Sequence, residues 1–430
     1  MGTEVVVMRS VSAVGREEWD ALVPPAQVYL SYDWLRAVEE CFGFELVLFL
    51  LRDGGRTVAG VQGLLVRDPD AFPYHDPTGA LFGDYEMDHL RQALERDRSP
   101  QESAEAGALL AAVVRAEAGH TRAAGYPALV MTSPYGYASD VLTLPGTDRK
   151  GAIGELLAAV DAFCRAEEIP SQSFLWESGG DADLHGALAG HGYLEFLSDL
   201  EYDLDTGSCA SLEEYLGTLE RKRRTVVRAE IRKFGEAGLR VERIADPGPA
   251  VIARCAELSE GQQKKYGLPV DRGAMERLFT ALLAAPALGP ALYVVRRRDA
   301  QGPDVSGPDA SGPDVSGPDV SGFLLCLEAG GVLHPKFLGF DATAVGAGYA
   351  YFNLVFYHQV GRAVAGGVRR IAYGMGSADA KRLRGCRPAP VRGWIRFSSP
   401  AAQRRIEPYV AVFDCLKKQL LGDQDGRVQR

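Results

Sequence analysis

Residues 351–386 read YFNLVFYHQVGRAVAGGVRRIAYGMGSADAKRLRGC, and this stretch decides the fold class. Its first part carries apolar residues at helical spacing and predicts a helix that ends at the Gly366-Gly367 pair. The short run VRRIAYG then predicts a strand, and SADAKRLRG predicts a short helix. With VRGWIRF (391–397) as a closing strand, the alternation of helix and strand predicts an α/β domain.

The first half of the chain repeats this order of elements. GAIGELLAAVDAFCRAEE (151–168) predicts a helix, SQSFLWE (171–177) a strand, DADLHGALAGHG (181–192) a short helix and YLEFLSDLEYDLD (193–205) a final strand. GDADLH, which ends at His185, and GSADAK, which ends at Lys381, lie 196 residues apart. We therefore predict tandem copies of one α/β unit, over 1–205 and 206–430.

A low-complexity segment interrupts the second copy. Residues 302–322 read GPDVSGPDASGPDVSGPDVSG, in which proline removes backbone donors, glycine raises the entropic cost of ordering and the aspartates repel one another. We expect a disordered, solvated insertion there. The flanking runs ALYVVRRRD and GFLLCLEAG predict a strand hairpin with the insertion at its tip, and FELVLFLLRDGG with RTVAGVQGLLV predicts a similar hairpin in the first copy.

The charge of the chain is unevenly distributed. Lys and Arg number 47 against 57 Asp and Glu, which gives a net charge of −10 and a sequence pI near 5.4. That balance excludes indiscriminate binding to DNA or to anionic lipid. Residues 221–233 nevertheless hold seven basic side chains against one acid, and residues 381–396 hold six and no acid. The sequence therefore leaves room for one polyanion, docked locally on the second copy.

Three further features bear on the compartment and the class of chemistry. The seven cysteines form no Cys-x-x-Cys pair, and their odd number cannot close fully into disulfides, which predicts a reducing, cytoplasmic environment. The N-terminal residues lack the pattern of a signal peptide, and no apolar run reaches the ~18 residues that a membrane span needs. No group of side chains has the spacing of a metal site.

The order of elements and three motifs resemble a known family. Each half reads as helix, strand hairpin, long helix, strand, short helix and strand, which is the order of a GNAT-type N-acyltransferase domain. SYDWLRAVEECFG (31–43), SLEEYLGTLERKRRTVVRAEIRKFGEAGLRVER (211–243) and the stretch 351–386 resemble the Fem-like aminoacyltransferases, which are tandem GNAT proteins. The resemblance implies two tandem GNAT-like domains with mixed central sheets in the Fem-like arrangement, the first an acceptor platform and the second catalytic.

The resemblance also implies catalytic residues in the second copy. Lys381 falls where Fem-like transferases carry a lysine implicated in acyl transfer, and an ammonium there could stabilise the oxyanion that forms on the attacked carbonyl. Its counterpart in the first copy is His185, so we assign the chemistry to the second. We also predict catalytic roles for Asp341, as a general base, and for Tyr373. The other candidates for the base are His334, His358 and the leaving oxygen of the substrate.

Two groups of residues bear on the acyl donor. Coenzyme A-dependent GNATs carry a loop Arg/Gln-x-x-Gly-x-Gly/Ala before the long helix, and its N–H groups bind pyrophosphate. This chain keeps Gly346 and Gly348 of that loop but has Thr343 at the first position. In Fem-like enzymes a positive surface receives the acceptor stem of aminoacyl-tRNA, and the two basic stretches correspond to it. The predicted donor-binding residues are Arg224, Arg228, Lys336, Gly346, Gly348, Asn353 and Arg384.

The acceptor is predicted to bind the first copy. Tyr135 and Tyr137 follow the strand ALVMT in the turn SPYGY, which exposes aromatic side chains for acceptor recognition. We expect an N-acyltransferase that moves an aminoacyl group from aminoacyl-tRNA, without a bound cofactor, to the amine of a small molecule or a cell-wall precursor. A coenzyme A thioester donor is one alternative. A non-catalytic recognition protein with the same fold is another.

Overall fold

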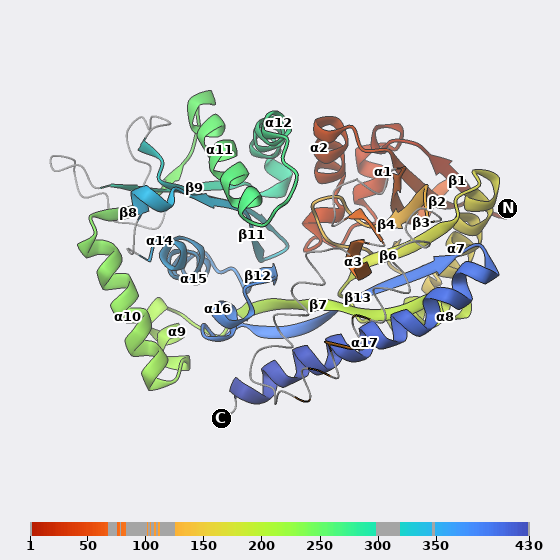
Figure 1. The fold of residues 1–430 in the computed structure, drawn as a ribbon. Coiled ribbons are helices and arrows are strands. Elements are labelled where there is room, and N and C mark those ends of the chain that lie inside the picture. The colour runs from red at the N-terminus through yellow and green to blue at the C-terminus, as the bar shows by residue number, and fades with distance from the viewer. Residues whose placement is uncertain are drawn as a thin grey trace. The chain divides into compact units, whose positions relative to one another are not determined.

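The computed structural model describes residues 2–67, 75–77, 79–82, 125–297, 319–345 and 349–428, with five single positions between 101 and 111. The chain divides into two units (Figure 1). Unit 1 comprises Met1–Pro24, Tyr29–Leu200 and Pro390–Arg430, and unit 2 comprises Pro25–Val28 and Glu201–Ala389. Within the described part, no helix is both long and apolar enough to cross a bilayer.

Unit 1 is built on a mixed sheet. Its strands lie in the order β1 (Thr3–Met8), β2 (Leu46–Asp53), β3 (Arg56–Val66), β4 (Ala128–Met131), β6 (Ser171–Glu177) and β13 (Arg387–Phe397), with the short β5 (Leu142–Thr143) against β3. These neighbours are antiparallel except β4 and β6, which pair in parallel from Ala128↔Ser171 to Met131↔Phe174. A parallel pair needs a crossover connection, and the long helix α7 (Arg149–Ala166) supplies it.

Helices cover both faces of the unit 1 sheet. On one face, α7 and α8 (Ala182–Gly190) share a buried apolar core with the strands, which includes Leu156, Phe174 and Leu184. On the other face Gly60 of β3 lies so close to Trp19 and Leu22 that a Cβ there would come within 3.1–3.2 Å of them. The remaining helices are η1 (Val11–Ala13), α1 (Arg16–Asp20), η2 (Val28–Leu30), α2 (Tyr32–Phe42), α3 (Gly79–Phe82) and α17 (Pro400–Val428).

Unit 2 repeats the arrangement. Its strands lie in the order β8 (Leu239–Ile244), β9 (Ala291–Arg297), β10 (Gly322–Ala329), β11 (Val332–Phe340), β12 (Arg370–Met375) and β7 (Leu194–Asp205, through its last residues). Only β11 and β12 are parallel among these neighbours. The helices are α9 (Leu212–Thr218), α10 (Arg221–Glu236), α11 (Pro249–Lys265), α12 (Arg272–Leu283), η4 (Pro286–Leu288), α13 (Ala342–Val345), α14 (Ala350–Phe352), the π-helical η6 (Asn353–Tyr357), α15 (His358–Ala365) and α16 (Ala378–Arg382).

The last strand of each copy is exchanged with the other copy. β7 follows α8 in the chain, yet its residues 201–205 pair with β12, where Leu204 lies opposite Ile371. β13 follows α16, yet it pairs with β6, where Trp394 lies opposite Phe174. The expected division into 1–205 and 206–430 therefore differs from the observed units, because residues 390–430 belong to unit 1. Strand pairing uses backbone hydrogen bonds, so the strand pattern alone does not say which edge a strand joins.

Both predicted hairpins are confirmed. β2 and β3 are joined by a turn at Gly54 and Gly55, whose φ values of +57° and +84° favour glycine. β9 and β10 pair antiparallel, with Val294 opposite Phe323. The insertion expected at 302–322 falls between these two strands, and its residues 302–318 lie outside the described residues.

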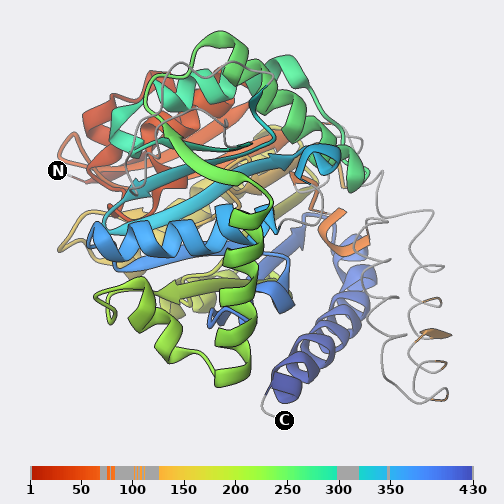
Figure 2. The same ribbon diagram turned by 90° about the vertical axis from the view of Figure 1, so that its left-hand side faces the viewer.

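Helix α10 crosses the long helix formed by α14, η6 and α15 in unit 2 (Figure 2). Asn353 of η6 donates from Nδ2 to the Glu230 carbonyl of α10 at 3.2 Å. This crossing lies beside Tyr349, where the chain enters the long helix with φ +57°. It joins the basic helix α10 to the start of the long helix.

Candidate functional site

The parallel strands of unit 2 separate soon after they meet. β11 and β12 pair only at Val332↔Arg370 and Leu333↔Ile371. On its other edge β11 contains a bulge, because Leu325 lies opposite Phe337 while Cys326 lies opposite Pro335, which leaves Lys336 as the extra residue. A bulge turns a side chain out of the regular alternation of a strand. Lys336 is half-buried, and loss of hydration lowers the pKa of its ammonium to about 7.

Lys381 is buried and holds the end of β12. Its Nζ donates to the carbonyl oxygens of Tyr373, Gly374 and Met375 at 2.8–2.9 Å, and the side chain is 5 % exposed. An ammonium has three N–H groups, and these three carbonyls occupy all of them. The geometry therefore does not favour the predicted contact between the Lys381 ammonium and a substrate oxyanion. The geometry favours a positioning role, because the turn that follows contains Gly374, Gly376 and Ser377 at φ +65°, +77° and +51°.

The other two predicted catalytic residues are also engaged within the fold. Asp341 accepts hydrogen bonds from the Thr343 N–H at 3.0 Å and hydroxyl at 2.6 Å, and its second oxygen pairs with Arg254 at 2.9 Å. Tyr373 is 8 % exposed and donates to the Val355 carbonyl at 3.3 Å. Burial raises the pKa of the Tyr373 hydroxyl well above its usual value. Tyr373 is therefore not arranged to exchange a proton with a substrate near neutral pH, whereas the role of Asp341 as a general base stays a prediction.

The two histidines considered as bases do not replace Asp341. His334 on β11 is 6 % exposed, and burial lowers its pKa to about 4, so its ring is neutral and weakly basic at pH 7. His358 begins α15, and its ring stands edge-on against Tyr293 at a centroid distance of 5.2 Å. That contact makes His358 part of the packing of unit 2.

Arg384 belongs to a buried polar cluster. Its guanidinium donates to Glu230 Oε2 at 2.8 Å, to the Tyr357 hydroxyl at 3.0 Å and to the Ala380 carbonyl at 2.9 Å. Tyr357 donates to the same Glu230 oxygen, and burial together with Glu230 raises the pKa of the Tyr357 hydroxyl. Arg384 is 4 % exposed and lies in the interior of unit 2, so direct contact with a donor stays a prediction. Its hydrogen bonds instead fix α10 against η6, which also places Asn353.

The basic face predicted on α10 lies at the surface. Arg228 is exposed and pairs with Glu213 at 2.6 Å, and Arg224 is half-buried and donates to the Gly217 carbonyl at 3.4 Å. Lys381 and Arg384 are buried, so they do not lie on the exposed face of α10 with Arg228. The predicted donor-binding residues Gly346 and Gly348 lie outside the described residues.

The two predicted acceptor tyrosines occupy a tight turn in unit 1. Tyr135 and Tyr137 both have φ +54°. Tyr135 is 8 % exposed, and its ring packs against Phe42 at 4.6 Å. Tyr137 is half-buried and stands edge-on to Trp176 at 5.9 Å. Tyr137 therefore has part of its side chain exposed to solvent, where a ligand could contact it, whereas Tyr135 is a core residue.

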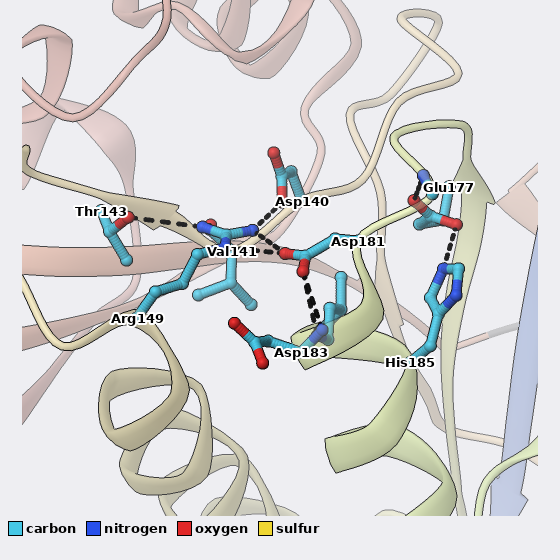
Figure 3. Close-up of polar contacts among 10 residues, drawn as sticks. Asp140, Val141, Thr143, Arg149, Glu177, Asp181, Asp183 and His185 are labelled. Atoms are coloured by element: carbon cyan, nitrogen blue, oxygen red, sulfur yellow. Dashed lines mark hydrogen bonds and ion pairs between the residues drawn. The ribbon is translucent and has the colours of Figure 1, made fainter.

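A carboxylate and a histidine that form a pair in unit 1 were not predicted as a site. His185 Nε2 lies 2.7 Å from Glu177 Oε2, and the other Glu177 oxygen accepts from the Gly180 N–H at 2.9 Å (Figure 3). Glu177 is 1 % exposed. The signal in the sequence is a glutamate at the end of a strand, followed by a histidine in the first turn of the next helix.

Beside this pair, one arginine joins three elements of unit 1. Arg149 at the start of α7 binds Asp181 and Asp140, the latter at 2.9 Å, and donates to the Val141 carbonyl (Figure 3). Asp181 also caps α8, because its Oδ1 accepts from the Asp183 and Leu184 N–H groups at 2.9 and 3.4 Å. The start of α8, and with it His185, is thereby held in place.

Three comparisons relate the chain to known proteins. Residues 221–382 match the family model described as an acetyltransferase (GNAT) domain. The crystal structure of FemX has a TM-score of 0.54 and 11 % identity, over 95 % of this chain and 100 % of that chain. A tandem GNAT protein from the clavulanic acid biosynthesis pathway has a TM-score of 0.49 and 13 % identity, over 93 % of this chain and 99 % of that chain. No curated protein sequence matches.

These findings bear out the predicted fold. The chain has the tandem α/β fold of FemX, with a mixed sheet in each unit. Residues 221–382, in its second unit, match the GNAT domain model.

Proposed function

We propose that this chain, in which residues 221–382 match a GNAT acetyltransferase domain, is an N-acyltransferase that transfers an aminoacyl group from aminoacyl-tRNA to a primary amine. The acceptor in this proposal is a small molecule or a peptidoglycan precursor. The reaction forms an N–C bond to the acyl carbon and breaks the C–O bond of the aminoacyl ester, while the amine loses one proton.

The observation that supports a tRNA donor is the outer face of α10. Its exposed cations are Arg221, Lys222, Arg223, Arg228, Arg232 and Lys233. The one acid of this stretch, Glu230, is turned inward and paired with Arg384. Among the described residues no carboxylate pairs with Arg221, Lys222 or Arg223, although Glu213 and Glu236 pair with two of the other arginines. Cations without partners gain most from phosphate contacts, because counterion release then drives binding.

Direct attack by the amine, without an acyl-enzyme intermediate, is consistent with the state of Cys386, which follows Lys381 and Arg384 in the chain. Cys386 is 6 % exposed, and burial raises its pKa to about 12, so it stays protonated and is a poor nucleophile at neutral pH. A covalent acyl-cysteine step is therefore not part of the proposal.

In this mechanism Lys336 takes the proton of the attacking amine. A pKa of about 7 lets its ε-amine be neutral in part of the molecules at pH 7, which a general base requires. It lies on the bulge of β11, close in the chain to the point where β11 and β12 separate. In this proposal Lys381 and the Glu230–Arg384 pair position the backbone of unit 2 and do not contact the reacting atoms.

A coenzyme A thioester is the second candidate donor. It is favoured by the description of the matching family as an acetyltransferase domain. It is also favoured by the separation of β11 and β12 after Leu333 and Ile371, which leaves backbone groups there without a ladder partner on the neighbouring strand. The chemistry of amine attack is the same for both donors.

The test follows radiolabel from aminoacyl-tRNA into a mixture of primary amines that includes a nucleotide-linked peptidoglycan precursor. We expect transfer that stops after ribonuclease treatment. The triple variant Arg221→Ala, Lys222→Ala, Arg223→Ala should bind tRNA more weakly, and its salt dependence should fall by about 2 in the slope of log K against log salt. Arg404→Ala with Arg405→Ala, on exposed residues of α17, is the matched control.

One outcome would exclude the tRNA donor. If label passes from acetyl-CoA to an amine at equal rates with and without ribonuclease, and the triple variant behaves as wild type, the coenzyme A donor takes its place.

A further inference from the structure

The position in unit 1 that corresponds to Lys381 holds an imidazole with a fixed orientation. The buried Glu177 carboxylate is held by the Gly180 N–H at one oxygen and faces His185 Nε2 at the other (Figure 3). A carboxylate accepts hydrogen bonds and donates none, so it holds the proton of a neutral imidazole on Nε2. Nδ1 is then the basic nitrogen of His185.

The basic nitrogen of His185 is accessible. Nδ1 has no hydrogen-bond partner among the described residues, and the side chain is 21 % exposed. His191, the residue that caps the C-terminal end of the same helix, serves as a comparison. His191 faces Asp161 at 3.1 Å, but Asp161 also binds Arg396 at 2.5 Å, so that carboxylate is shared with a permanent cation.

Backbone strain gathers next to the His185–Glu177 pair. Trp176, directly before Glu177, has φ +70° and is the extra residue of a bulge, because Glu177 lies opposite Arg392 while Leu175 lies opposite Gly393. Its ring meets Tyr137, which also has positive φ. A residue with a side chain is strained at such φ values, and strain of this kind concentrates at sites where function requires it.

A buried donor beside His185 lacks an acceptor. The rings of His185 and Trp394 lie 5.3 Å apart between centroids. Trp394 is 2 % exposed, and its indole N–H has no acceptor among the described residues. A buried N–H without an acceptor costs free energy, so the carbonyl oxygen of a bound ligand is a suitable partner for it.

The charge around the pair favours a cation. Asp140, Asp181 and Asp183 lie to one side of the pair, with the guanidinium of Arg149 among them (Figure 3). Arg149 forms ion pairs with Asp140 and Asp181, whereas Asp183 at the start of α8 is exposed. A primary amine arrives as an ammonium ion, which this field attracts, and it must lose a proton before it can attack.

We propose that unit 1 contains a second acyl-transfer centre, in which His185 accepts the proton of a primary amine and Glu177 positions the imidazole. The amine nitrogen attacks the carbonyl carbon of an acyl ester or thioester, and the N–C bond forms as the C–O or C–S bond breaks. The proton passes from the amine to His185 Nδ1 and then to the leaving oxygen or sulfur. This inference rests on the proposed function for its class of reaction and places that reaction in unit 1 as well.

The first test acylates the imidazole itself. Diethyl pyrocarbonate modifies neutral histidine, and peptide mapping of the full chain gives a rate for each of the seven histidines. In Glu177→Gln the amide can donate to Nε2, which moves the ring proton to Nδ1. We expect modification of His185 to slow at least tenfold, while Asp161→Asn leaves it unchanged. An unmodified His185 in wild type, or equal rates in wild type and folded Glu177→Gln, would overturn the proposal.

The second test separates this proposal from the proposed function of unit 2. With 4-nitrophenyl acetate as donor and ethanolamine as amine, amide formation is measured in a Lys336→Met background, which removes the proposed base of unit 2, with either His185→Gln or the control His191→Gln added. We expect His185→Gln to reduce the rate at least tenfold, within the range of general-base effects, and His191→Gln to retain most of it. If His185→Gln has no effect here while tRNA-dependent transfer proceeds, unit 1 has no such centre and the function of unit 2 stands.

Discussion

Replacement of Lys381 tests whether its ammonium positions a turn or contacts the substrate. Lys381→Met keeps the length of the side chain and removes three charged hydrogen bonds of 2.8–2.9 Å to the carbonyls of residues 373–375. Hydrogen bonds to charged groups contribute roughly 1.5–3 kcal/mol each, and a buried carbonyl left without a donor costs about 1–3 kcal/mol. Removal of the cost of burying an ammonium offsets part of that loss. We therefore expect a net destabilisation of about 3 kcal/mol.

Thermal unfolding measures this loss. For a unit of this size, about 3 kcal/mol lowers Tm by roughly 6–12 °C. Hydrogen exchange read by mass spectrometry should show faster exchange over residues 371–385, the segment that Lys381 ties together. Lys222→Met, on the exposed face of α10, is the matched control and should change the free energy of unfolding by less than about 0.5 kcal/mol.

The transfer assay completes the test of Lys381. A positioning role predicts that loss of activity accompanies loss of stability and that cooling restores part of the activity. A Lys381→Met protein that unfolds as wild type and has lost transfer at every temperature would refute the positioning role and restore the predicted contact with the oxyanion.

Three further perturbations have defined outcomes. Arg149→Met should lower the free energy of unfolding by about 2 kcal/mol, because it leaves Asp140 and Asp181 without their partly exposed cation. Burial raises the pKa of Asp181, but Arg149 lowers it overall, so the stabilisation is lost as Asp181 becomes protonated. Urea titrations should therefore show a difference in stability between wild type and variant at pH 7 that shrinks as the pH falls below about 4, and a constant difference would contradict this. If Lys336 is the base, its neutral form is active, so kcat should rise with pH through about 7 and lose that step in Lys336→Met. Glu230→Gln, which leaves a buried guanidinium without its carboxylate, should lower stability by about 3 kcal/mol, whereas an unchanged Tm would exclude a structural role for this pair.

Local patterns account for the part of the fold that was predicted correctly. The Gly366-Gly367 pair ends the long helix as expected, with α15 closing at Ala365 and Gly367 at φ +71°. The hairpin at Gly54 and Gly55 follows from the same conformational freedom. Such features depend on residues within a few positions of one another, so the sequence contains all the information that they need.

The predicted catalytic and donor residues show that local patterns do not predict which side chains are buried. Lys381 was expected to face a substrate because of its position in the Fem-like resemblance, and Arg384 because it belongs to the basic stretch 381–396. Their burial depends on partners that the chain supplies from other elements, such as the end of β12 for Lys381 and Glu230 of α10 for Arg384. No spacing rule connects residue 230 to residue 384.

The sequence by itself determined the α/β class, the tandem repeat, the two hairpins and the basic character of α10, because periodicity, turn residues and charge are local properties. The tertiary structure decided which strand closes each sheet and which acid on α10 turns inward. It also decided that the counterpart of Lys381 in unit 1 meets a carboxylate. The physical reason is that backbone ladders and buried polar pairs form between segments far apart in the chain, and their partners are selected by packing of the whole unit.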